Sequence, residues 1–120
     1  MADDLLAIIK KRRSVRHFLD KSLSKENIEK IIEAGNWAPS ASNIQGWRFI
    51  IVDKIDIKRR LVDLGGSPVI KDAPQGILVI YDNQSINLEY MDYLQSAAAA
   101  IQNMLLESCS LGIASCWICR

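Results

Sequence analysis

The sequence contains few of the residues on which disulfide frameworks and metal centres depend. Its 120 residues include three cysteines, one histidine and three prolines. The cysteines, Cys109, Cys116 and Cys119, are odd in number and lie near one end of the chain, whereas a disulfide scaffold uses an even set spread along it. No second cysteine pair completes a zinc site with Cys116 and Cys119. We therefore expect a reduced, cytoplasmic protein without a bound metal.

A strong net charge and a long apolar run are also lacking. The formal net charge is +1, which argues against general affinity for nucleic acid. The chain opens with the acidic sequence Met1-Ala2-Asp3-Asp4, so we expect no secretory leader. No stretch approaches the roughly 18 apolar residues of a membrane-spanning helix, so we expect no membrane partner. Hydrophobic residues nevertheless make up 49% of the chain, which predicts an apolar surface covered by a partner subunit.

Hydrophobic periodicity predicts an α+β (α/β layered) fold made by a single domain, residues 1–120. Helices are predicted at residues 4–12, from Ser24 to Gly35, at 55–64 and at 87–111. Strands are predicted at 47–52, 76–81 and 113–118, the first two as buried strands because their apolar runs are continuous. The last helix would span nearly 40 Å and is apolar on more than one face. This pattern predicts that a second subunit packs against it.

The first segment that could carry chemistry is basic. Arg12, Arg13, Ser14 and Arg16 follow the first predicted helix. Guanidinium groups match the geometry of phosphate in a bidentate way, and a hydroxyl adds another donor. The alternative is a solvated cationic helix end, which also complements the helix dipole. Charge alone favours this alternative.

The second segment is a polar turn between a helix and a strand. Pro39 fixes its entry, and Ser40, Asn43 and Gln45 supply hydrogen-bond donors and acceptors. Such groups suit the carbonyl and imide edge of a flat heterocycle. The alternative is ordinary turn chemistry, for which serine and asparagine are common.

Taken together, these segments resemble the nitroreductase (flavin reductase) family over nearly the whole chain. The resemblance is carried by several motifs in order: Arg12-Arg13-Ser14-Val15-Arg16-His17-Phe18, Ala34-Gly35-Asn36-Trp37-Ala38-Pro39-Ser40, Asn43-Ile44-Gln45-Gly46-Trp47-Arg48-Phe49, Ala97–Leu106 and Leu111-Gly112-Ile113. It implies a nitroreductase-like mixed sheet flanked by helices, with a long central helix at the interface of an intertwined homodimer.

The resemblance also implies a cofactor and a reaction. Arg12, Arg13, Ser14 and Arg16 would hold the phosphate and ribityl chain of FMN. Pro39, Ser40 and Asn43 would approach the flavin from the other subunit, and Gln45 is also expected to bind the cofactor. NAD(P)H would reduce the FMN, and a nitroaromatic, quinone or related small-molecule acceptor would then take the electrons in a ping-pong cycle. No residue of the protein is expected to act as a catalytic acid or base.

Two departures from the family pattern leave alternatives open. Gly46 stands where the family usually has proline, and the chain stops at Arg120, where family members continue. The second departure motivates an alternative function: a truncated, non-catalytic domain that self-associates and binds flavin weakly or not at all. A third hypothesis, nucleic-acid binding through Lys10–Arg16, rests on the basic cluster alone.

Overall fold

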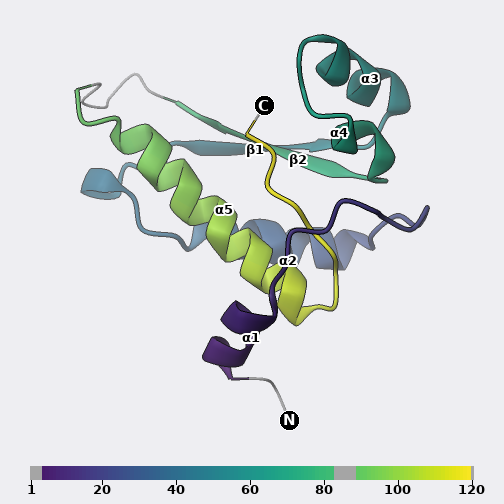
Figure 1. Cartoon of the computed structure of the whole chain (residues 1–120). Coiled ribbons are helices and arrows are strands. Elements are labelled where there is room, and N and C mark those ends of the chain that lie inside the picture. Colours follow the sequence, from purple (N-terminus) through teal and green to yellow (C-terminus); the bar gives the residue numbers. More distant parts are fainter. Residues whose placement is uncertain (1–3, 83–88, 120) are drawn as a thin grey trace.

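The computed structural model describes residues 4–82 and 89–119, arranged as helices around a small sheet (Figure 1). The elements in chain order are α1 (Leu5–Lys11), α2 (Lys25–Asn36), the 3-10 helix η1 (Ala41–Asn43), β1 (Trp47–Val52), α3 (Ile55–Asp63), α4 (Val69–Asp72), β2 (Gly76–Tyr81) and α5 (Asp92–Ser110). The expected α+β class is confirmed. The predicted helix 87–111 begins later, at Asp92, and its first two residues lie outside the described part.

The first two helices begin where the sequence supplies capping side chains. The Asp4 carboxylate accepts a hydrogen bond from the Ala7 amide at 2.8 Å. The Ser24 hydroxyl accepts one from the Asn27 amide at 3.2 Å. Each bond satisfies an amide that has no partner within its own helix.

Gly35 was expected to end the second helix, but α2 continues through Asn36. Gly35 is instead buried, and a Cβ atom there would lie 2.8 Å from Cγ of Met104 and 3.2 Å from Cζ of Phe49. Its lack of a side chain therefore allows α2 to pack closely against α5. The prediction failed because a glycine in a helix can serve packing as well as termination.

The sheet is a two-stranded antiparallel ladder in which Trp47 pairs with Tyr81 and Val52 with Gly76. The Trp47 and Tyr81 rings meet edge to face, with centroids 6.2 Å apart and an interplanar angle of 76°. Trp47 packs with Ala38 and Ala100 in the buried core. The alanine-rich middle of α5 therefore leaves room for the tryptophan ring.

The predicted third strand at 113–118 is wrong. In the described chain this segment makes an isolated parallel bridge, in which Ser115 pairs with Ser14. The expected mixed sheet is therefore a two-stranded antiparallel sheet, with that bridge as its parallel part. The apolar run 113–118 follows α5 as irregular chain, because apolar character alone does not provide a strand with a pairing partner.

The expectation that both strands are buried is met only in part. One face of the sheet carries Ile50, Leu78 and Ile80, whose exposed fractions lie between 41% and 46%. The opposite face carries Trp47 and Tyr81 toward the core. The continuous apolar pattern reflects two apolar faces, and each is covered only in part: Val52 on the first face is buried, and Ile51 on the Trp47 face is 45% exposed.

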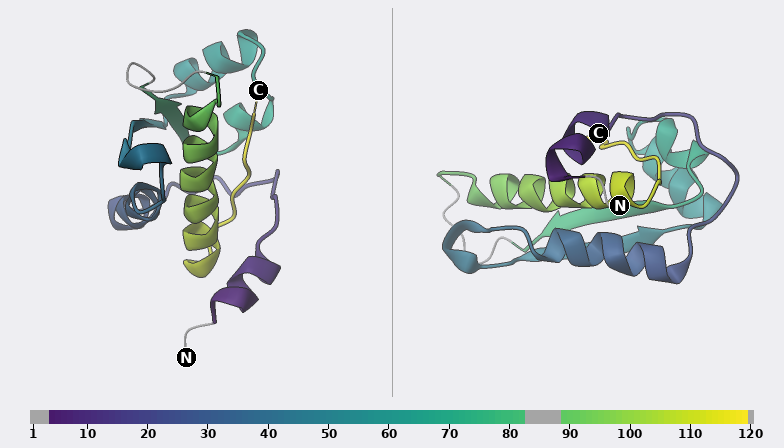
Figure 2. Two further views of the ribbon diagram at one scale, coloured as in Figure 1. Left: turned by 90° about the vertical axis from the view of Figure 1, so that its left-hand side faces the viewer. Right: turned by 90° about the horizontal axis from the view of Figure 1, so that it is seen from below.

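Helix α5 is the central helix of the fold, and different elements of the chain lie at its two ends. Figure 2 shows α1 projecting at the C-terminal end of α5. Helix α1 has no buried residue, and its side chains Leu5, Leu6 and Ile9 are exposed. The turn η1 lies near the other end, where the Ala41 amide donates to Ser96. None of the described helices is both long and apolar enough to cross a membrane.

Candidate functional site

The basic segment is an extended stretch of chain that starts where α1 ends. Arg12 leaves the helical conformation, with φ −55° and ψ 135°, while its amide still donates to the Ile8 carbonyl. Beyond it the Val15 amide donates to the Ser115 carbonyl at 3.0 Å. The basic segment is therefore fixed to the chain that follows α5.

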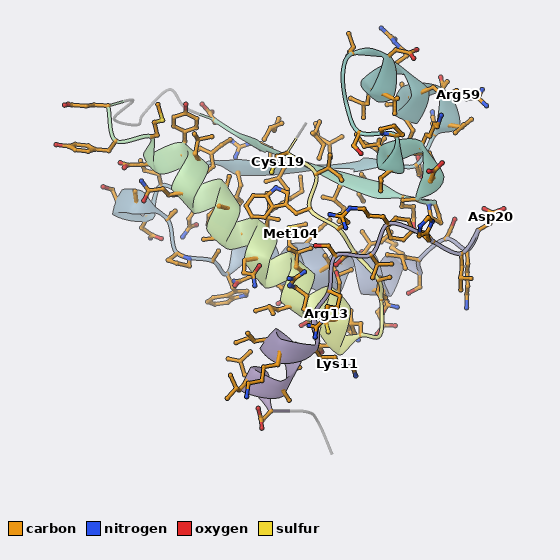
Figure 3. The ribbon with its side chains drawn as sticks, viewed as in Figure 1. Lys11, Arg13, Asp20, Arg59, Met104 and Cys119 are labelled. Atoms are coloured by element: carbon orange, nitrogen blue, oxygen red, sulfur yellow. The ribbon has the colours of Figure 1, made fainter. Side chains whose placement is uncertain are left out.

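An open pocket of about 320 Å³ lies between these two stretches. Its walls come from the basic segment on one side and from the end of α5 and the chain after it on the other: Lys11, Arg12, Arg13, Val15, Cys109, Gly112, Ile113, Ala114 and Ser115. Lys11 and Arg13 lie close together at this end of α5 in Figure 3. Three cationic side chains at one pocket create a site suited to an anion.

The four basic-segment residues predicted for the site differ in their placement. Arg12 is half-buried and lines the pocket. Arg13 also lines it, and its guanidinium donates to the carbonyls of Lys10 and Arg12 at 2.5 and 2.8 Å. Ser14 and Arg16 are exposed and lie outside the lining. The structure thus gathers two of these side chains at the pocket and leaves the other two exposed outside its lining.

The polar turn is held largely by its own side chains. The Ser40 hydroxyl accepts from the Gln45 amide at 2.9 Å. The Gln45 side-chain amide donates to Oδ1 of Asn43 at 2.6 Å. Pro39, Asn43 and Gln45 are exposed, and Ser40 is half-buried. Part of the donor and acceptor set predicted for a ligand therefore shapes the turn itself.

The backbone of this turn is unusual. Ser42, Asn43 and Gln45 have positive φ angles of 54°, 53° and 54°. This left-handed region costs Ser42 and Gln45 roughly 1–2 kcal/mol each, whereas asparagine adopts it more readily. The turn therefore depends on contacts that hold it in place.

Gly46 follows the turn at a position of close approach. A Cβ there would lie 2.7 Å from Cε1 of Tyr81 and 2.9 Å from the Asp82 carbonyl oxygen. Beside it an open pocket of about 210 Å³ is lined by Ile44, Gln45, Gly46, Arg48 and Asp82. Gly46 thus brings the end of the turn against β2.

The structure holds the two predicted segments at opposite ends of α5. The turn is attached at Ser96 through the Ala41 amide, at 3.2 Å. The basic segment follows α1, which approaches α5 at Cys109, whose thiol lies 3.9 Å from the Ile8 carbonyl oxygen. Ser96 and Cys109 are thirteen residues apart on α5, or about 20 Å at 1.5 Å per residue. One chain does not bring the two segments together.

Several residues at these places were not predicted for the site. Ser96 accepts a hydrogen bond from the turn, Ser115 accepts one from the basic segment, and Cys109 lines the pocket beside that segment. The sequence offers one signal that Ser96 has a special role: it is a polar residue directly before the alanine run of a helix predicted to be buried. Cys109 and Ser115 carried no comparable signal. The three cysteines are free thiols, and the described residues contain no group of His, Cys, Asp and Glu suited to a metal.

Comparison with known proteins identifies relatives of this chain. The model of the nitroreductase family matches residues 9–69. A provisionally named NADH dehydrogenase/NAD(P)H nitroreductase of Archaeoglobus fulgidus is 36% identical over 117 residues, covering 97% of this chain and 67% of the relative. An FMN-dependent nitroreductase from Clostridium difficile R20291 has a similar structure, with a TM-score of 0.83 and 34% identity, over 94% of this chain and 65% of the other.

A nitroreductase of Bacteroides fragilis, solved with bound FMN, is also similar, with a TM-score of 0.80 and 28% identity over 97% of this chain and 70% of that one. The chain spans about half to two thirds of the length of the first curated relatives, between 47% and 67%. The matched family region contains both the basic segment and the polar turn. On these matches and the shared fold, the chain belongs to the nitroreductase family.

Proposed function

We propose that the protein is an FMN-dependent oxidoreductase that works as a homodimer with a site at each end of the subunit interface. Each site combines the basic segment of one subunit (Arg12, Arg13, Ser14 and Arg16) with the polar turn of its partner (Pro39, Ser40, Asn43 and Gln45). NAD(P)H is the electron donor, and a nitroaromatic, quinone or related small molecule is the acceptor in a ping-pong cycle. Such a protein is expected in the cytoplasm.

The observation that carries this proposal is the separation of the two segments along α5. About 20 Å of helix lies between their attachment points, so one chain supplies the two halves of a site at opposite ends of α5. A two-fold axis across the middle of α5 would place the basic segment of one subunit beside the turn of the other. The exposed apolar side chains of α1 and of the start of α5 supply surface for such an interface: Leu5, Leu6, Ile9, Tyr90, Met91 and Leu94.

The residues of the basic segment fit a phosphate monoester. Arg12 and Arg13 line an open pocket, and Lys11 adds a third cation to it. Ser14 and Arg16 are exposed outside the pocket lining and would supply a hydroxyl and another guanidinium to a ligand that extends out of the pocket. Each charge-assisted hydrogen bond contributes roughly 1.5–3 kcal/mol to binding.

The residues of the turn fit the edge of a flat heterocycle. Asn43 and Gln45 keep hydrogen-bonding capacity beyond their mutual bond, because each carboxamide has two donors and an acceptor. Pro39 stiffens the entry and the Ser40 hydroxyl fixes the path of the backbone. The bound flavin supplies hydride and electron transfer, while these residues bind it, orient it and exclude water from one edge.

An absorption experiment tests this function. Purified protein is desalted, mixed with FMN and passed through a second desalting column. We expect flavin bands to travel with the protein and to bleach when NAD(P)H is added without air. The colour should return when a quinone is added. Protein that emerges colourless from saturating FMN would contradict the proposed function.

A second candidate function is supported by the partly exposed face of the sheet. Ile50, Leu78 and Ile80 present a contiguous apolar surface on β1 and β2. Such a surface favours a domain that self-associates and binds flavin weakly or not at all. Light scattering of the desalted protein gives its oligomeric state, and its colour shows whether flavin is bound. Dimers that hold flavin support the oxidoreductase, and larger colourless assemblies support the second candidate.

A further inference from the structure

Ser96 joins the polar turn to the central helix. It lies on α5 directly before the run Ala97–Ala100, and 4% of its surface is exposed. Its hydroxyl oxygen accepts a hydrogen bond from the Ala41 amide, the first residue of η1, at 3.2 Å. A buried hydroxyl directly before the alanine run of α5 therefore fixes the turn to this helix.

The rest of the turn is bonded to itself. Within the described part of the chain, the other hydrogen bonds of residues 40–45 join members of that segment: Asn43 amide to Ser40 carbonyl, Ile44 amide to Ala41 carbonyl, Gln45 amide to Ser40 hydroxyl and Gln45 side chain to Asn43 side chain. These bonds define the shape of the turn. They do not define where the turn lies relative to α5.

The shape of the turn is also strained. Three of its residues have φ angles near 54°, a conformation that persists only where neighbouring structure enforces it. Without the bond to Ser96, the hydrogen bonds within the turn would no longer fix its position against α5. Its exposed side chains, Asn43 and Gln45, would then no longer point in a fixed direction.

We infer that Ser96 is a positioning residue for the ligand-binding turn: its hydroxyl holds Ala41 so that Asn43 and Gln45 are preorganised for the flavin edge. This inference rests on the proposed function for the identity of the ligand. Its structural part, the fixation of the turn by Ser96, stands on the hydrogen bonds above. Preorganisation raises affinity because ordering occurs before binding.

The test compares substitutions of two buried serines of α5. Ser96→Ala removes the hydroxyl that the Ala41 amide uses. Ser108→Ala is the matched control, because Ser108 is also 4% exposed but its hydroxyl donates to the Met104 carbonyl of the same helix, at 2.8 Å. Ser96→Thr and Ser96→Val form an isosteric pair that differs in the hydroxyl, so they separate hydrogen bonding from packing.

Three quantities are measured for each variant: the FMN dissociation constant by fluorescence quenching, the melting temperature, and amide hydrogen exchange at Ala41, Asn43 and Gln45. We expect Ser96→Ala to weaken FMN binding about tenfold and to speed exchange at these amides, since a part-buried donor loses its partner. Ser96→Val should behave like Ser96→Ala. Ser96→Thr and Ser108→Ala should retain wild-type affinity and exchange.

The inference would be overturned by wild-type exchange and affinity in Ser96→Ala, or by equal losses of affinity in Ser96→Ala and Ser108→Ala. Equal behaviour of Ser96→Thr and Ser96→Val would also contradict a role for the hydroxyl. A wild-type chain that binds no FMN would contradict the proposed function instead. In that case the exchange rates still decide whether Ser96 fixes the turn.

Discussion

The basic segment and the polar turn flank the same helix but are built in different ways. Arg12–Arg16 is an extended stretch fixed by backbone bonding to Ser115, and most of its side chains are exposed. The turn from Ser40 to Gln45 is folded on its own side chains, contains left-handed residues and is attached to α5 through Ser96. Charge is therefore the main property of the first segment, and shape is the main property of the second.

This difference predicts that the two segments respond differently to substitution. Removing charge from an exposed segment changes ligand binding and leaves the fold intact, because few packing contacts are lost. Disturbing the turn changes stability and binding together, because its conformation is strained and borders the core residue Trp47. The predictions below test this contrast, beginning with the largest expected effect.

The double substitution Arg12→Ala and Arg16→Ala should have the largest effect on ligand binding. Two charge-assisted contacts of roughly 1.5–3 kcal/mol each are lost, so FMN affinity should fall at least about a hundredfold. The melting temperature should remain near that of the wild type. FMN titration and thermal unfolding of the same samples measure both properties.

Arg59→Ala provides the control for this substitution. Arg59 is an exposed cation on α3, far from Lys11 and Arg13 in Figure 3. Its loss changes net charge by one but should leave FMN affinity unchanged. If Arg59→Ala weakened FMN as much as the double variant, general electrostatic attraction would explain the binding, and the proposed phosphate contacts would be wrong.

Gly46→Ala should have a smaller effect and should act on stability as well as binding. The added Cβ would meet Tyr81 at 2.7 Å and the Asp82 carbonyl oxygen at 2.9 Å, so β2 or the turn must move. We expect a loss of about 1–3 kcal/mol in the free energy of unfolding, as for overpacking in a well-packed region. Urea denaturation measures this quantity.

Gly76→Ala is the matched control for Gly46→Ala. A Cβ at Gly76 would lie 3.9 Å from the Val52 carbonyl oxygen, an ordinary contact distance. It should leave stability unchanged or slightly raised, because alanine reduces the freedom of the unfolded chain. Equal destabilisation by both alanines would show that close approach at Gly46 is not the cause.

The smallest effect is expected outside both segments, at the exposed pair of Glu26 and Lys30 on α2. Lys30 lowers the pKa of Glu26 through a hydrogen bond and its charge, and Glu26 raises the pKa of Lys30 in the same way. The contribution of Glu26 to stability is present above its unfolded-state pKa, near 4.5, and is lost as the pH falls through its lower folded-state pKa.

Glu26→Gln removes this pH-dependent contribution. The stability of the variant should therefore lie slightly below that of the wild type near neutral pH and approach it in acid. FMN affinity should not change, because the pair lies outside the basic segment and the turn. Urea midpoints measured from pH 3 to pH 7 test the prediction, and a variant that diverged further from the wild type in acid would refute it.

Local features of the fold were predictable where short-range chemistry determines them. The helix predicted to begin at Ser24 does so, with Ser24 as its cap, and the strands 47–52 and 76–81 have the predicted bounds. Gly35 and the segment 113–118 were predicted wrongly. Their structure depends on tertiary partners, Met104 in the first case and a pairing strand in the second, and periodicity does not reveal these partners.

The candidate site shows the same limit. Sequence motifs singled out the residue types of both segments, but not that Arg13 donates to neighbouring carbonyls or that Ser40 holds Gln45. Ser96 was missed because its role depends on contact with a residue 55 positions away. The separation of the segments along α5 also required the three-dimensional arrangement.

Subunit complementation tests the central claim most directly. One variant carries Arg12→Ala and Arg16→Ala, the other Asn43→Ala and Gln45→Ala, and neither should bind FMN alone. Each mixed dimer would contain one site with both segments intact, so unfolding and refolding an equimolar mixture should restore about a quarter of the wild-type binding capacity. If the mixture bound no more FMN than the separate variants, both segments would not belong to one intersubunit site, and the account would be contradicted.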